Sequence, residues 1–147
     1  MLFAEQEEVD VATVIQETGG VKEDAVIQGL DFIAAIDAHR QWKKRLTDVI
    51  EGKSTEILDQ SVICQDDKCV LGKWIYCTGK IHCSHMLSFH ELKAEHAKFH
   101  LQAANVLQLA RAGKLEEAML NVLEGDFAKA SRKVQTLLSK VYLEIKA

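Results

Sequence analysis

Residues 89–100 read Phe-His-Glu-Leu-Lys-Ala-Glu-His-Ala-Lys-Phe-His, and this stretch decides the fold. Its apolar residues and two of its histidines recur every three or four positions, as on one face of an α-helix. That face continues through Ala103, Val106, Leu107 and Ala110. The spacing therefore predicts a long amphipathic helix, with His96 and His100 side by side and turned toward a core.

A second helical seam places another histidine inside. It comprises Phe32, Ile33, Ile36, His39, Lys43, Leu46 and Ile50. A buried imidazole without a partner costs about 1–3 kcal/mol. For any one histidine, a separate hydrogen bond to a carbonyl or carboxylate is the simpler explanation. Three such histidines in one core favour a shared ligand.

Cys69 is the candidate fourth member of this group. Asp66 or Asp67 is a plausible N-cap for a short helix, which would place Cys69 in its first turn. The helix dipole would favour the thiolate there, the form that binds metals and reacts with oxidants. Taken alone, Cys69 would be interpreted as a small buried hydrophobe. Together with three inward histidines it predicts a buried metal site.

The donor set favours zinc, because Zn²⁺ prefers a tetrahedral shell of imidazole nitrogen and thiolate sulfur. Copper(I) and nickel remain open on ligand type alone. Four protein ligands would leave no coordination position at which a water molecule could be activated. This argues against a zinc hydrolase, and the chain is not expected to be an enzyme.

The same residues carry a resemblance. His39 is followed by Trp42, and residues 69–74 read Cys-Val-Leu-Gly-Lys-Trp. Gly79 comes next, and the last part of the motif is the stretch 89–100 quoted above. The sequence thereby resembles the chemoreceptor zinc-binding domain family, which occurs in bacterial cytoplasmic chemoreceptors, at the head of some diguanylate cyclases, and as freestanding small proteins.

The resemblance implies one Zn²⁺ per chain, held by His39, Cys69, His96 and His100. Gly72, Lys73 and Trp74 belong to the motif without being ligands. It also implies a sensory module, commonly homodimeric, in which metal occupancy controls helix packing and signals to a chemoreceptor or diguanylate cyclase partner in chemotaxis or cyclic-di-GMP signalling. An alternative is an oxidant (hypochlorite) sensor acting through the zinc-bound thiolate of Cys69.

Composition points to one globular domain of the all-α class. The 147 residues are 48% hydrophobic and include no proline, which suits long uninterrupted helices. The net charge of −4 comes without a basic stripe, so nucleic-acid binding is not expected. No run is apolar enough for a membrane span and the start does not resemble a secretion signal, so a cytoplasmic location is expected.

The predicted architecture is an antiparallel up-and-down four-helix bundle with a broken second helix and a buried zinc site. Residues 1–24, with Gly19-Gly20, form an N-terminal lead-in, and residues 25–147 form the domain. Expected helices run from Asp24 to Glu51, from a Ser54 cap to Ile63, around Cys69 to near Gly79, from Ser84 to Ala112, and from Lys114 to the end.

Other residues leave alternatives open. A second metal site is conceivable from Cys77, His82, Cys83, His85 and His90, although their spacing matches no common zinc pattern and loop roles are preferred. Cys64 is a candidate disulfide partner of Cys69 on oxidation. A di-iron enzyme or oxygen carrier is least favoured, because such bundles need bridging carboxylates and Glu-x-x-His pairs.

Overall fold

The computed structural model describes residues 26–147, and it is almost entirely helical. Its elements are β1 (Val26–Ile27), β2 (Leu30–Asp31), α3 (Phe32–Ile50), α4 (Gln60–Ile63), α5 (Val70–Tyr76), α6 (Thr78–Cys83), α7 (Leu87–Arg111), α8 (Leu115–Glu124) and α9 (Asp126–Lys146). The predicted all-α class is confirmed. The lead-in 1–24 and Gly19-Gly20 lie outside the described residues, and the domain boundary at residue 25 remains a prediction.

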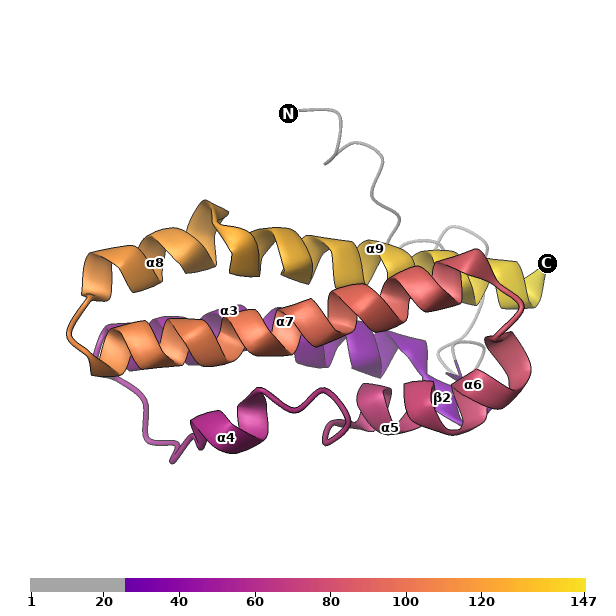
Figure 1. Cartoon of the computed structure of the whole chain (residues 1–147), viewed down its shortest axis with the longest axis horizontal. Coiled ribbons are helices and arrows are strands. Elements are labelled where there is room, and N and C mark those ends of the chain that lie inside the picture. The colour runs from indigo at the N-terminus through magenta and orange to yellow at the C-terminus, as the bar shows by residue number, and fades with distance from the viewer. Residues whose placement is uncertain (1–25) are drawn as a thin grey trace.

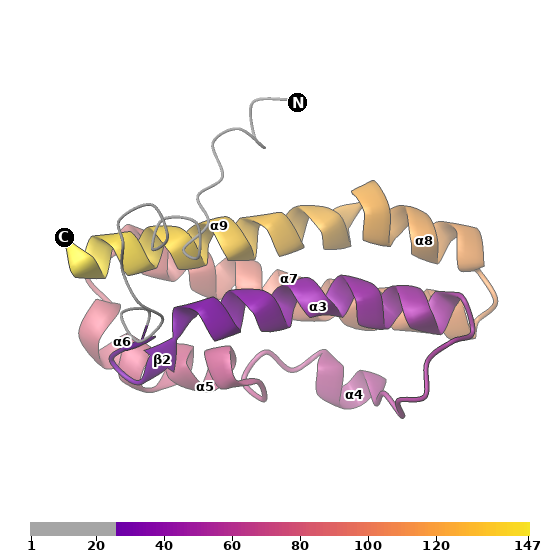
Figure 2. The same cartoon turned by 180° about the vertical axis from the view of Figure 1, so that it is seen from behind.

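Three long arms lie side by side and form the body of the bundle. α3, α7 and the successive pair α8 and α9 run roughly parallel to one axis, and the short helices α4, α5 and α6 line up along the remaining side (Figure 1). The view from behind shows the same order (Figure 2). The expected four-arm arrangement with a broken second arm is therefore what the chain adopts.

The first long helix begins later than expected, at Phe32 instead of Asp24. Val26–Ile27 and Leu30–Asp31 pair as a two-stranded antiparallel hairpin. Its turn residues Gln28 and Gly29 both have positive φ, 52° and 84°, as a tight hairpin turn requires. Asp31 then caps α3, because its Oδ1 accepts a hydrogen bond from the Ala34 N–H at 3.0 Å. The helix ends close to the predicted position, with Gly52 at φ 73° just beyond it.

The helical segments of the broken arm differ in position from the prediction. Ser54 does not cap a helix: its hydroxyl accepts from the Glu56 N–H at 3.2 Å, and the chain stays non-helical up to Asp59. Asp59 caps the single turn of α4 instead. Farther on, α5 ends at Tyr76, and α6 begins within the predicted Cys69 helix and continues through residues 80–83, which were expected to form a loop.

The last arm is two helices, where one was predicted. Gly125 separates α8 from α9 in an extended conformation, and the Asn121 side chain accepts a hydrogen bond from the Phe127 N–H at 2.8 Å beyond the break. A Cβ added at Gly125 would approach the Asn121 Cα to 2.8 Å, so the close packing here depends on glycine. α7 agrees better with the prediction, beginning three residues after Ser84 and ending before Gly113.

The core lies between the long arms and the short-helix side. Its largest fully buried side chains include Phe32, Phe89, Phe99, Phe127, Leu46, Leu71, Leu92 and Leu138. Phe32 makes edge-to-face contacts with both Trp74 of α5 and Tyr142 of α9, at ring-centroid distances of 5.6 and 5.7 Å. These contacts fix α5 against the long helices, which matters because α5 positions Cys69. Across residues 26–147, every helix is too short or too polar to span a membrane.

Candidate metal centre

Four side chains predicted to bind a metal meet at one point inside the bundle. His39 comes from α3, Cys69 from the residue preceding α5, and His96 and His100 from α7. One ligand-type atom from each lies within 4.8 Å of all the others. The three histidines are 3%, 0% and 4% exposed, and Cys69 is half-buried. Among residues 26–147 this is the one such cluster, and it contains no carboxylate, which disfavours the di-iron alternative.

The spacing of the candidate donor atoms of Cys69, His96 and His100 suits a tetrahedral ion, while the His39 donor atom lies within 4.8 Å of these three. His96 Nε2 and His100 Nε2 lie 3.0 Å apart, and Cys69 Sγ lies 3.3 Å from the first and 3.6 Å from the second. With ordinary Zn–N and Zn–S bond lengths, tetrahedral geometry separates two nitrogens by about 3.3 Å and a nitrogen from a sulfur by about 3.6 Å. The observed separations differ from these by a few tenths of an ångström at most.

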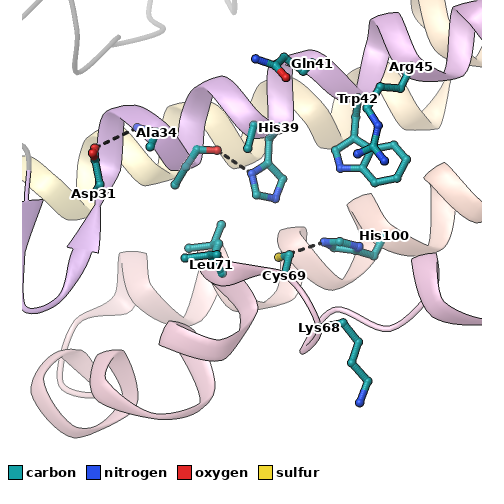
Figure 3. A pocket seen from close by; sticks show the side chains of 13 residues that line it. Asp31, Ala34, His39, Gln41, Trp42, Arg45, Lys68, Cys69, Leu71 and His100 are labelled. Carbon is teal, nitrogen blue, oxygen red and sulfur yellow. Dashed lines mark hydrogen bonds between the residues drawn. The ribbon is translucent and has the colours of Figure 1, made fainter. Parts of the chain in front are cut away.

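His39 provides the clearest sign that a partner belongs in the centre. Its Nδ1 lies 2.7 Å from the Ala35 carbonyl oxygen, one helical turn back, so Nδ1 carries the proton. The remaining nitrogen, Nε2, is fully buried and has no hydrogen-bond partner. Figure 3 shows the ring held in this way on α3, across from Cys69 and His100. An unpaired buried acceptor costs about 1–3 kcal/mol, a cost that a bound metal removes.

Main-chain carbonyls orient two of the imidazoles. The Ala35 carbonyl accepts a hydrogen bond from His39, whereas the nearby Asp37 carboxylate accepts one from the Gln41 side chain at 2.9 Å. The Ile63 carbonyl, at the end of α4, accepts from His100 Nδ1 at 2.9 Å. Such outer contacts fix the tautomer of a metal-binding histidine. His96 Nδ1 is buried without a partner, and no described contact explains this.

Burial keeps all three imidazoles in their neutral, metal-binding form. It lowers the pKa of His39 from 6.5 to about 4, with a small further decrease from His100. It lowers the pKa of His96 to about 2, assisted by repulsion from His100 and His39. The pKa of His100 is also lowered by burial, although the Ile63 carbonyl and Asp66 oppose the change.

Cys69 differs from expectation in position and in ionisation. Neither Asp66 nor Asp67 caps α5: Cys69 is itself the N-cap, and its sulfur accepts from the Gly72 N–H at 3.3 Å. Burial raises the pKa of the thiol, outweighing the lowering by the N–H groups of Gly72 and Leu71. The predicted preference for a thiolate is therefore wrong for the metal-free protein, because desolvation exceeds the effect of a seven-residue helix.

The motif glycines allow close packing around Cys69. A Cβ added at Gly72 would lie 1.7 Å from the Asp66 carbonyl oxygen, and one at Gly79 would lie 2.8 Å from the Trp74 ring. Trp74 in turn donates to the Gln28 carbonyl at 3.0 Å and packs edge-to-face on Phe89. The tryptophan therefore joins the hairpin to α5 and α7 as part of the core. Lys73 lies exposed on α5.

Asp66 and Tyr76 form a contact that sequence reasoning missed. The Tyr76 hydroxyl donates to Asp66 Oδ2 at 2.6 Å, which ties the loop before Cys69 to the last residue of α5. This bond is the first cause of the rise in the Tyr76 pKa to about 12. No motif spacing marks such a pair, since one member lies in a loop.

The alternative second metal site does not form. Within the described chain, Cys77, His82, Cys83, His85 and His90 supply no group of three neighbouring ligand atoms. His90 Nε2 bonds the Ser84 carbonyl at 2.7 Å, and Cys83 is fully buried. All four cysteines are free thiols, and that of Cys64 donates to the Ser61 carbonyl at 3.3 Å.

A cavity of about 550 Å³ adjoins the centre. It lies between α3 and the segment that carries Cys69, as Figure 3 shows. Three of the four candidate ligands, His39, Cys69 and His100, line it, whereas His96 does not. Trp42 also faces this cavity, with the Arg45 guanidinium 3.8 Å from its ring centroid.

Comparison with known proteins agrees with the geometry. Residues 39–107 match the family model of the chemoreceptor zinc-binding domain, a match that begins at His39 and includes all four clustered residues. The chain matches no curated protein and no solved structure at a significant level. The segment 39–107 therefore belongs to the chemoreceptor zinc-binding domain family, a family of regulatory sensory domains that bind zinc.

Proposed function

We propose that the chain is a sensory domain that binds one Zn²⁺ through His39, Cys69, His96 and His100. The observation that carries this proposal is the convergence of three buried imidazoles and one thiol from three separate segments, with the His39 Nε2 unpaired at their centre. Zinc supplies a closed tetrahedral shell at such a site, holding the donors together without an open position for water.

Occupancy would act on helix packing, because the donors come from α3, the start of α5, and α7. In the absence of an ion, three neutral imidazoles and a thiol are held together mainly by the surrounding core. A ligand that binds only the folded bundle stabilises it by RT ln(1 + [Zn]/Kd), about 2.7 kcal/mol at a free concentration of 100 Kd. Zinc therefore selects the arrangement in which α5 lies closed against α3 and α7.

The test is metal analysis combined with competitive titration of the purified protein. We expect one zinc per chain, and a fall in affinity of about tenfold or more for His96→Ala or His100→Ala. His85→Ala is the matched control, because His85 is exposed and outside the cluster, and it should leave affinity unchanged. Equal losses in all three variants would refute the ligand assignment. Protein purified without added metal that carries copper or nickel in place of zinc would refute the assignment of zinc.

The signalling step is proposed from the family. The chain would form a homodimer that passes the change in helix packing to a chemoreceptor or a diguanylate cyclase, in chemotaxis or cyclic-di-GMP signalling. The sensing step and the output can be tested separately. Sedimentation of the zinc-loaded and metal-free protein should reveal the dimer, and hydrogen exchange should reveal faster exchange around α5 when zinc is removed. Identical exchange in both forms would contradict control of packing by zinc.

A second candidate is oxidant sensing through Cys69. The supporting observation is that this residue is half-buried and lines a solvent-connected cavity beside the other donors. Hypochlorous acid converts a thiolate into a sulfenic acid with release of chloride, and the oxidised sulfur binds zinc less well. Since burial raises the thiol pKa, the reactive thiolate would depend on bound zinc.

Mass spectrometry after oxidant treatment separates the two candidates. Oxidation of Cys69 in the zinc-loaded protein, with release of the ion, supports the oxidant sensor. An unmodified Cys69, in a protein whose α5 loosens when a chelator removes zinc, supports metal sensing. Cys64 is an internal control in the same digest, because it is also a free, half-buried thiol but lies outside the cluster.

A further inference from the structure

The cavity beside the metal centre has one buried and one open side. Its floor includes His39, His100 and Leu71, each less than 5% exposed. Its rim includes Ala34, Ala38 and Gln41 on α3, all exposed, and Val70, which is 75% exposed. The space therefore extends from the surface to the region where His39, Cys69 and His100 lie, although the His39 Nε2 itself is fully buried. His96 is the deepest donor and lies outside it.

The size and shape of this space exceed the needs of an ion. A bare Zn²⁺ with its donors fills only the point where the four atoms meet, whereas about 550 Å³ falls within the range of small-molecule pockets. Part of its α3 side is formed by the short side chains of alanines 34, 35 and 38, and the larger side chains of Trp42 and Arg45 line another part.

We propose that this cavity is an exchange site, in which a small thiol-bearing chelator binds beside the ion and removes or delivers zinc by direct ligand exchange. This inference rests on the proposed zinc site and adds how zinc reaches and leaves it. A closed four-ligand site loses its ion slowly by simple dissociation, because several bonds must break before solvent replaces them. An incoming thiol would avoid this, because it could bind the ion before all the protein donors have left.

The exchange replaces one bond to zinc by another and changes no oxidation state. The incoming thiol releases its proton to solvent and forms a Zn–S bond as one bond between zinc and a protein donor breaks. A second thiolate of the same molecule repeats the step. When the Cys69 sulfur is displaced, it takes up a proton from solvent. His39, Cys69 and His100 face the cavity and so are the donors that exchange first, while His96 is the last to release the ion.

The experiment uses the full zinc-loaded chain and dithiothreitol, a small dithiol. Zinc remaining on the protein is measured by metal analysis after rapid desalting at timed intervals. We expect the rate of zinc loss to rise in proportion to dithiol concentration, and to fall about tenfold when the same thiols are attached to a large dextran that cannot enter the cavity. A rate independent of dithiol concentration would overturn the proposal.

Variants that fill the cavity provide the second test. Ala38→Leu and Ala34→Leu add bulk at exposed helical positions on its rim, where leucine keeps helix propensity high. Each should slow dithiol-driven zinc loss about tenfold while leaving equilibrium affinity nearly unchanged. Ala94→Leu, at an exposed position of α7 outside the cavity, is the control and should change neither.

Zinc binding and zinc exchange are tested by different outcomes. Wild-type protein that binds no zinc refutes the proposed function. Normal zinc binding with unaltered exchange in Ala38→Leu and Ala34→Leu refutes the exchange site alone.

Discussion

The Nδ1 atom of His100 lies 2.9 Å from the main-chain oxygen of Ile63, and this contact joins the candidate metal centre to the short helix α4. α4 is a single turn held by the Asp59 cap, and the segment just before it is also fixed by the Arg111 side chain, which donates to the Leu58 carbonyl. A short and locally stabilised helix therefore sets the orientation of a buried imidazole on α7.

Asp59→Ala tests this connection. Asp59 Oδ1 accepts from the Ser61 N–H at 2.9 Å, and loss of such a cap costs about 1 kcal/mol. A looser α4 should hold the Ile63 carbonyl less firmly, so zinc affinity should fall about fivefold. In a His100→Ala background the same substitution should have no effect on zinc affinity. An equal loss in both backgrounds would show that α4 acts by another route.

Gly72→Ala tests the packing of the loop before Cys69. The new Cβ would overlap the Asp66 carbonyl oxygen, so the loop and the start of α5 must separate. Zinc affinity should fall about tenfold or more, while circular dichroism of the metal-free protein stays close to wild type, because the long helices are untouched. Gly113→Ala is the control: its φ of 80° makes alanine unfavourable by about 1 kcal/mol, but it lies far along the chain from the donors. Unchanged affinity in Gly72→Ala would contradict the role of this contact.

The cluster of candidate ligands could be predicted from the sequence because it is made of side chains. His96 and His100 stand one helical turn apart on an apolar face, and the structure places His39 and Cys69 within reach of both. The contacts that orient the donors were less predictable. The Ala35 and Ile63 acceptors are main-chain carbonyls, which every residue has, so no sequence pattern marks them.

The predicted helix boundaries are wrong where contacts in the folded structure override the local preference of the sequence. The first helix was predicted to begin at Asp24, but positive φ at Gln28 and Gly29 turns the chain into a hairpin whose Gln28 carbonyl accepts a hydrogen bond from the Trp74 indole N–H. Gly125 was treated as part of one long helix, yet its contact with Asn121 divides α8 from α9. The Gln28–Trp74 contact joins residues 46 positions apart, which no sequence window includes, whereas the contact with Asn121 is local and depends on the extended backbone at Gly125.

The metal-free protein should become less stable as the pH falls below about 6.5. The pKa of His39 is lowered to about 4 in the folded state, so between these values the unfolded chain binds a proton that the folded chain does not. Stability from the neutral imidazole is complete above the unfolded pKa and declines by about 1.4 kcal/mol per pH unit as the pH falls. His96 and His100, whose pKa values are also lowered, act in the same direction.

Urea unfolding of metal-free protein between pH 7 and pH 5 measures this effect, before most carboxylates titrate. His39→Gln should reduce the slope by the contribution of one histidine. His85→Gln should retain the full slope, because that side chain is exposed. Stability that is constant over this range would mean that the imidazoles are not buried in the neutral form.

Zinc binding near pH 7.5 should release about one proton per ion. The three histidines have lowered pKa values and are already neutral, whereas burial raises the pKa of Cys69 and keeps its thiol protonated until zinc binds. Calorimetry in buffers of different ionisation enthalpy counts the protons released, because the apparent binding enthalpy changes in proportion to that number. Cys69→Ser should bind zinc more weakly and release almost none, since a serine hydroxyl keeps its proton, whereas Cys64→Ser should release the same number as wild type. Release of two or more protons by the wild-type protein would show that at least one imidazole is charged before binding, contrary to the effect of burial inferred for the three histidines.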